Sequence, residues 1–398
     1  MGWTSGIPAR SLTATLFAIA AVSRAAVLPD DRADLDWHDW SGGGVTVDGP
    51  SVLVRKKVND SLSLSANYSV DMISSASVDV LSTASPYKEK HTEGTVSADY
   101  LHGNTIYTVG FIEGHEPDYI AKTGFFSISQ SMFGDLTTLS FGYSRGWDKV
   151  GEDVYPHGYA QGDRMTTWIG DADHRNWNGG LSQVLTRNLL LALNLETGES
   201  DGTPGSLANP GSLANPYRTA RFLGPDGLVH AEPQIYPGTR TGTAGSMQLK
   251  YYLPWHAALD GSYRIYHDTW GILGHTLSAG YTQPLFTDWI FNGKVRYYRQ
   301  NAATFYSDLF PYQDSQNFMA RDRELAQFDD WTVGLGATWN FRPHWPSWIE
   351  KGTVNLTYDR MHIAYADFHN YAVGGTPDNV PLYAYSANIT QFFISFWY

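Results

Sequence analysis

A strict alternation of apolar and polar residues is the feature that most constrains the fold of this chain. In the segment 61–72, every second residue is apolar and the residues between are mostly serine: the apolar set is Leu62, Leu64, Ala66, Tyr68, Val70 and Met72. Successive side chains of a β-strand point to opposite faces, whereas the side chains on one face of a helix recur about every 3.6 residues. The alternation therefore predicts a strand with one apolar and one polar environment.

The same pattern returns along the rest of the chain, in segments 93–100, 107–111, 139–144, 247–253, 259–265, 289–297, 332–339 and 354–358. A soluble β-sandwich also alternates, but its strands are usually about 5 or 6 residues long. The strands expected here run to about 10 to 14 residues, which is long enough to cross a bilayer at a tilt. Glycine and serine gather on the polar face, and aromatic residues lie at the ends of the apolar face. We therefore expect an all-β protein, a transmembrane antiparallel β-barrel with a polar lumen.

The connections between these segments alternate in length. Short turns are expected at residues 58–60, 102–104, 133–135, 186–188 and 254–256, with two longer ones at 284–288 and 343–351 on the same side. Longer polar stretches lie between them, at 74–90, 149–165, 200–237, 301–323 and 365–382. Outer-membrane barrels have short periplasmic turns and longer extracellular loops. With an N-terminal strand around Asp34–Trp40, the pattern predicts about 16 strands and both termini in the periplasm.

Residues 1–25 are expected to be a cleaved signal peptide, which leaves 26–398 as the barrel. Arg10 supplies positive charge, 12–22 is an uncharged apolar run, and 23–25 offers a small-x-small cleavage site. The run is shorter than the roughly 20 residues of a membrane-spanning helix. No later segment approaches that length of apolar sequence, which argues against a helical membrane protein.

The C-terminal residues carry a second indication of the compartment. Phe392, Ile394, Phe396 and Tyr398 share one face and end in an aromatic residue at the terminus. This pattern resembles the C-terminal signal that the outer-membrane assembly machinery reads, in which Phe is the commoner last residue. A bare aromatic edge strand in a soluble protein would invite aggregation. We therefore expect a protein of the bacterial outer membrane, with its lipid and its assembly machinery as partners.

Charge and cysteine content exclude several classes of function. Removal of Arg10 and Arg24 leaves 25 basic and 40 acidic residues, a net charge of about −15, so nucleic acid is not an expected partner. The chain has no Cys, which excludes disulfides, thiolate catalysis and Cys-based metal centres.

The candidate site is the polar face of the strands. The expected lumen-lining charged residues have both signs, and opposed charges across a channel would create a transverse field; mutual pairing that stabilises the interior is the alternative. They are Asp71, Glu93, Asp99, Lys250, Asp260, Arg264, Lys294, Arg296 and Asp359. Asp34, Asp36 and His38 share a face and are weak candidates for a metal site, the alternative being solvated lumen charges.

Two further motifs have ordinary explanations. Gly142–Gly146 matches the G-x-S-x-G pattern of serine hydrolases, but Ser144 is expected in an extended strand rather than at the required strand-to-helix elbow. Residues 205–210 and 211–216 are an exact tandem repeat in the longest expected loop, which fits a neutral duplication better than a binding element. We expect neither an enzyme nor a cofactor.

The N-terminal third resembles an uncharacterised bacterial family of outer-membrane β-barrel proteins, known only as a domain of unknown function. The resemblance is strongest over 45–150, and its carrying segments are 47–51, 68–80, 83–88 and 128–138, leading into 142–148. It implies an outer-membrane location and no settled activity. The resemblance also implies that the gene lies near genes for a flavin-attaching transferase and a thioredoxin-like protein. Periplasmic redox or flavin-transfer proteins are therefore expected as partners.

Together these observations favour a porin-like channel, passive or gated, whose lumen passes or binds a small solute. The alternatives are a structural barrel that scaffolds periplasmic or surface redox partners and, less favoured, an outer-membrane enzyme that would need a Ser, His and acid cluster at the rim.

Overall fold

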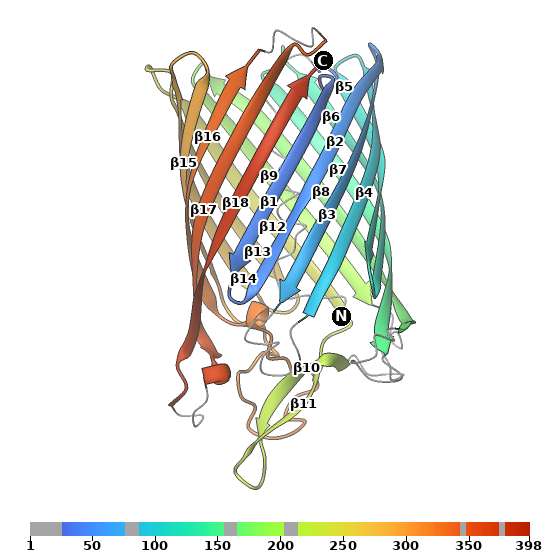
Figure 1. The fold of residues 1–398 in the computed structure, drawn as a ribbon, viewed down its shortest axis with the longest axis vertical. Coiled ribbons are helices and arrows are strands. Elements are labelled where there is room, and N and C mark those ends of the chain that lie inside the picture. Colours follow the sequence, from blue (N-terminus) through green and yellow to red (C-terminus); the bar gives the residue numbers. More distant parts are fainter. Residues whose placement is uncertain (1–25, 76–86, 155–164, 203–213, 343–347, 374–378) are drawn as a thin grey trace.

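The computed structural model describes residues 26–75, 87–154, 165–202, 214–342, 348–373 and 379–398. Sixteen antiparallel strands close into one barrel, in which β1 pairs with both β2 and β18. Figure 1 shows the tilted strands as a continuous wall. The bounds of the barrel strands are β1 (Arg32–Gly42), β2 (Val45–Asn59), β3 (Leu62–Ser75), β4 (Tyr87–His102), β5 (Thr105–Glu116), β6 (Tyr119–Met132), β7 (Thr137–Val154), β8 (Met165–Thr186), β9 (Leu189–Gly202), β12 (Thr239–Tyr252), β13 (Ala258–Asp268), β14 (Leu273–Leu285), β15 (Trp289–Gln300), β16 (Phe328–Phe341), β17 (Lys351–His369) and β18 (Leu382–Trp397).

The predicted all-β class and the count of about sixteen strands are confirmed. The described residues add only a two-stranded sheet, β10 (Ala214–Leu223) with β11 (Val229–Ile235), and two 3-10 turns, η2 (Arg323–Leu325) and η3 (Tyr371–Val373). Among these residues, no helix is long and apolar enough to cross a membrane. The expected signal peptide and most of the tandem repeat lie outside the described residues.

The two ends of the barrel differ. The five short turns and two longer connections that were predicted on one side lie at the end that we call the turn end, together with Tyr398. They join β2 to β3, β4 to β5, β6 to β7, β8 to β9, β12 to β13, β14 to β15 and β16 to β17. At the opposite end, the loop end, lie the five longer stretches, together with three tight turns after β1, β5 and β13 that the sequence analysis did not locate. In Figure 1 the turn end is at the top, and β10 and β11 extend below the loop end.

Several strands are longer than the sequence predicted. β7, β8 and β17 contain 18, 22 and 19 residues and continue into stretches that were expected to be loops. The extra residues still form ladders, for example between Gly151–Val154 and Met165–Trp168. In these extensions the strands remain paired but their residues no longer alternate between apolar and polar. A strand that extends beyond an apolar environment has water on both faces, so neither face is required to be apolar.

The outer face of the wall carries the apolar half of the alternation. Leu335 is 69% exposed, and Leu277, Val96 and Val109 are each 58–59% exposed. The C-terminal aromatic set shares this face, since Phe392 lies opposite Leu356 and Ile394 opposite Val354. The polar partners of these residues, such as Ser63 and Asp359, are buried on the inner face. We call this inner face the lumen face.

Segment 301–327, between β15 and β16, folds across the loop end of the lumen. Gln300 Nε2 donates hydrogen bonds of 2.9 Å to the carbonyls of Glu324 and Ala326. Ala326 packs in one cluster with lumen-face residues of β17 and β18, namely Ile363, Tyr365 and Tyr383. Leu325, Phe305 and Ala303 pack in a second cluster with Ile272, against Tyr266 of β13. The segment therefore covers the part of the mouth lined by β13 to β18.

Buried charges fix this cover in place. Arg321 is 4% exposed, and its Nε donates to Asp308 Oδ1 at 2.8 Å and its Nη2 to the carbonyl of His369 at 2.9 Å. The β10–β11 hairpin is attached to the same segment by two backbone hydrogen bonds of 2.9 Å between Ile235 and Met319. Removing one member of such a buried network lowers the free energy of unfolding by more than the network's net contribution to stability, because the remaining partners are left buried without hydrogen bonds.

A charge on the outer face should be costly and a charge on the lumen face tolerated. We expect Leu335→Lys to lower the free energy of unfolding by about 2–4 kcal/mol if the outer face meets lipid. Thr357→Lys, on the lumen face between Gly336 and Gln391, should change it by less than about 1 kcal/mol. Urea unfolding in lipid vesicles measures both; equal losses would contradict the assignment of faces.

Candidate functional site in the barrel interior

The register places all nine predicted lumen-lining residues on the lumen face. Asp71, Glu93 and Asp99 lie on β3 and β4 in line with the serines of β3. Lys250, Asp260 and Arg264 lie in line with Gln248, Ser262 and Ser246. Lys294, Arg296 and Asp359 align with Gly280, Ser278 and Gly334. The same register adds Glu89, Arg240 and Asp330, which the sequence analysis did not select.

The acidic residues gather on one side of the lumen. Asp34 and Asp36 of β1, Asp71 of β3, and Glu89, Glu93 and Asp99 of β4 all lie there. Arg55 Nη1 contacts Asp99 Oδ2 at 2.5 Å, and Thr108 donates to the other oxygen at 2.7 Å. Among the described residues, Glu93 makes no ion pair within 4.0 Å. The acids of this side therefore outnumber their basic partners.

The opposite side carries five cations, four of which are paired with individual acids. β13 lies half-way round the ring from β3. The ion pairs on this side are Arg240–Asp268 at 2.6 Å, Arg264–Glu196 at 3.1 Å, Lys294–Asp359 at 2.7 Å and Arg296–Asp330 at 2.7 Å. Lys250 and Asp260 face each other in the register without an ion pair within 4.0 Å between them. Both predicted features, opposed charges and mutual pairing, thus occur together.

Glycines give the lumen charges room to reach across strands. Lys294 and Asp359 are on β15 and β17, with Gly334 of β16 between them in the register. A Cβ at Gly334 would lie 2.0 Å from Asp359 Oδ1. His38 Nε2 of β1 reaches Asp71 Oδ1 of β3 at 3.1 Å across Gly49 of β2, where a Cβ would lie 1.7 Å from the carbonyl oxygen of Val70. Small residues on the lumen face therefore let charged side chains lie along the wall.

The three metal candidates separate into different contacts. Asp34 Oδ2 lies 3.0 Å from Arg32 Nε in an ion pair, while His38 Nδ1 lies 3.6 Å from Asp36. Gln391 donates to the other oxygen of Asp36 at 2.9 Å. Within the described part of the chain, no group of three His, Asp or Glu residues is arranged to hold a metal ion. The cluster is an ion-pair network on the acidic side of the lumen.

Ser144 lies in the middle of β7, in extended backbone opposite Asn176. The structure instead brings Ser200 of β9 to 3.0 Å from His174 Nδ1 of β8, and His174 Nε2 to 2.8 Å from Asp148 Oδ2 of β7. Ser200 and Asp148 are each 26 positions from His174 in the sequence, so the contacts become apparent only from the register of the strands. The backbone of Ser200 pairs with β8 on one side and β12 on the other. It therefore forms no elbow with free N–H groups, which a serine hydrolase uses to stabilise an oxyanion.

Comparison with known proteins identifies a family. The family model described as "Protein of unknown function (DUF3570)" matches residues 12–349. The chain belongs to this family. The resemblance predicted from 45–150 is thereby confirmed, and the match extends over most of the barrel. A search of curated proteins finds no significant match.

Three of the solved structures similar to this DUF3570 member are matched over nearly their whole length. A chain titled "Bacterial polysaccharide outer membrane secretin" has a TM-score of 0.49 and 7% identity, covering 93% of this chain and 99% of that one. A Pseudomonas aeruginosa FadL homologue has a TM-score of 0.42 and 11% identity, with coverage of 95% and 93%. A mutant of the TodX monoaromatic hydrocarbon channel has a TM-score of 0.40 and 11% identity, with the same coverage. The function of this DUF3570 member must therefore be argued from its own residues.

Gly334→Ala tests the role of glycine on the lumen face. The added methyl group would displace Asp359 from Lys294, and we expect a loss of about 1–3 kcal/mol in the free energy of unfolding, as for crowding of a packed site. Gly245→Ala controls for the loss of a strand glycine, because Gly245 lies on the outer face opposite Ile265 and a Cβ there meets nothing within 4 Å. Equal urea midpoints for the two variants would show that the close approach at Gly334 is unimportant.

Proposed function

We propose that this protein is a channel of the bacterial outer membrane that passes small polar solutes and prefers cations. The observation that supports this most is the division of one closed wall into an apolar outer face and a polar, charged lumen face. A barrel of 16 strands has an interior wider than side chains alone need fill.

The outer face supports placement in a membrane. Its apolar band ends at the turn end in a group of contacting aromatic rings: Trp289 with Trp339, Trp339 with Phe341, and Phe341 with Phe396, with centroids 5.1–6.3 Å apart. At the loop end it gives way to charged pairs, among them Arg145–Asp173 at 2.6 Å and Lys122–Glu113 at 3.2 Å. Aromatic girdles and charged rims mark the two interfaces of outer-membrane barrels. We place the turn end in the periplasm and the loop end outside the cell.

The preference for cations follows from the balance of charge. Four of the five lumen-face cations on the β12–β15 side have an acidic partner within 4.0 Å, and the fifth, Lys250, faces Asp260 in the register. The acids of β1, β3 and β4, by contrast, include Glu93, which makes no ion pair among the described residues and faces no cation in the register. Acidic groups lining a pore favour cation entry. The residual field across the lumen would also orient solutes that carry both charges.

The cover formed by 301–327 is the element that sets how much of the mouth is open. It contacts the lumen face through Gln300 and through the cluster around Ala326. A channel with a loop folded across its mouth conducts less than the bare barrel, because the loop occupies part of the cross-section.

Reconstitution in planar lipid bilayers tests the channel. We expect discrete conductance steps in potassium chloride. In a salt gradient, we expect a reversal potential whose sign shows that potassium passes more readily than chloride. A folded, inserted protein that stays silent over a range of voltage, pH and salt would contradict the proposal. That outcome would favour a scaffold for periplasmic redox or flavin-transfer partners.

Neutralising the acidic side tests the origin of selectivity. In the double variant Asp71→Asn, Glu93→Gln, the reversal potential should move toward zero, because fewer negative charges line the lumen. Asp226→Asn is the control, since Asp226 lies on the turn between β10 and β11, paired with His230. His230 lowers the pKa of Asp226 through their hydrogen bond, so the control removes one carboxylate that is charged at neutral pH. A larger effect in the control would place the selectivity outside the lumen.

Shortening the cover tests its position. Replacing residues 303–325 by a Gly-Ser linker should raise the single-channel conductance, because the segment leaves the mouth of the lumen. Unchanged conductance in a correctly folded variant would show that the segment does not restrict the path.

A further inference from the structure

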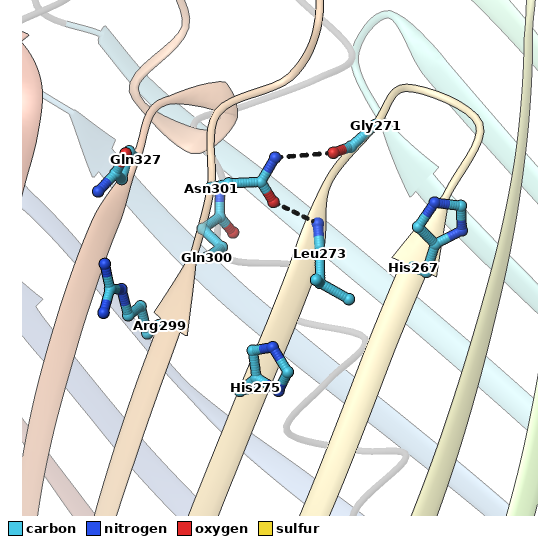
Figure 2. A pocket seen from close by; sticks show the side chains of 8 residues that line it. All are labelled: His267, Gly271, Leu273, His275, Arg299, Gln300, Asn301 and Gln327. Carbon is cyan, nitrogen blue, oxygen red and sulfur yellow. Dashed lines mark hydrogen bonds between the residues drawn. The ribbon is translucent and has the colours of Figure 1, made fainter.

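A pocket of about 530 Å³ lies at the loop end, where β13, β14 and β15 meet their connecting turns. Figure 2 shows three basic side chains around it: His267 from the end of β13, His275 from β14 and Arg299 from β15. Asn301 forms its upper edge through hydrogen bonds to the carbonyl of Gly271 and the N–H of Leu273, at 2.8 and 2.5 Å. The pocket is thus a built concavity rather than a gap between strands.

The three bases belong to the outer face, not to the lumen. His275 is the register partner of both Ile265 and Arg299. Two residues nearer the turn end, Leu277 pairs with Tyr297 in the same way. Leu277 is 59% exposed on the outer wall, and side chains two residues apart on a strand share a face. The pocket therefore opens towards whatever surrounds the barrel.

Aromatic rings lie directly next to this row of bases. Tyr297 and Trp331 are in contact, with ring centroids 4.6 Å apart, and Tyr263 donates or accepts a hydrogen bond of 2.7 Å with His275 Nδ1. Aromatic belts lie at the level of lipid headgroups. Arg299 is two residues beyond Tyr297, which is about 7 Å further along the strand, at the level of headgroup phosphates.

Arg299 is available for a ligand. Among the described residues it makes no ion pair within 4.0 Å, although Asp329 of β16 is its register partner and faces the same side. Within the described part of the chain, His275 makes a hydrogen bond to Tyr263 through Nδ1 and stacks on its ring, and its Nε2 has no hydrogen-bond partner. Asp329, His275 and Arg299 lie side by side on adjacent strands, and His267 lies one row nearer the loop end. Asp329 is the acid in this group, so basic side chains outnumber acidic ones around the pocket.

We propose that this pocket binds the phosphate group of a membrane lipid. The Arg299 guanidinium presents paired N–H donors that match phosphate oxygens, and the histidine rings add donors across the pocket. The exposed side chains of Ile265, beside His275, and of Leu277, two residues nearer the turn end, supply an apolar surface for the start of an acyl chain. This inference rests on the membrane placement in the proposed function, and not on conduction.

Native mass spectrometry of the full mature protein, with dioleoylphosphatidic acid titrated into the detergent, tests the proposal. The wild type should retain a bound lipid, and Arg299→Gln should bind it about tenfold more weakly, the loss expected for a hydrogen bond to a charged group. Arg187→Gln, at the turn between β8 and β9, is the matched control and should bind as the wild type does. His275→Gln should weaken binding in the same direction and replaces the arginine variant if that one does not fold.

Two outcomes overturn the proposal. Equal lipid retention by wild type and both pocket variants would show that the pocket is not the site. Displacement of the lipid by an equal concentration of inorganic phosphate would show a free-anion site instead of a lipid site. Bilayer conductance should be the same in Arg299→Gln and wild type, so that failure of the lipid site and failure of the channel are told apart.

Discussion

The whole structure depends on the hydrogen-bonded closure of β1 against β18. A strand inside lipid cannot leave its backbone N–H and C=O groups unpaired, because no water is present to bind them. The eleven residues of β1 pair with β2 on one side and with β18 on the other, from Arg32 with Trp397 to Gly42 with Ala387. Closure removes both sheet edges at once and defines an inside and an outside for every other side chain.

That division explains the composition of both faces. The outer face keeps large apolar residues such as Leu335 exposed, which is stable only next to another apolar phase. The lumen face has serine, glycine and charges, and its charges are largely satisfied by one another across glycines such as Gly334. In the function that we propose, the acidic side around Asp71 and Glu93 sets the selectivity of the path through the lumen, and the cover at 301–327 sets its width.

The fold could be predicted because apolar and polar residues alternate strictly within single segments such as 61–72. The same alternation identifies which residues of each strand face the lumen. The nine charged positions were therefore found by counting along strands. Contacts such as His174 with Asp148 and Ser200, or Lys294 with Asp359, depend on the register between strands, which one strand's sequence does not specify. The inward course of 301–327 was also not predictable, because it rests on packing of Ala326 against residues from β17 and β18.

The central claim is that adjacent residues of one strand meet different phases, and the absence of Cys from the chain allows it to be measured directly. Single cysteines are placed at each position from Leu64 to Ser69 of β3, and the protein in lipid vesicles is treated with a charged, membrane-impermeant maleimide. We expect labelling at Ser65, Asn67 and Ser69, which are partly exposed on the lumen face, and protection at Leu64, Ala66 and Tyr68. Uniform labelling, or protection without alternation, would contradict it.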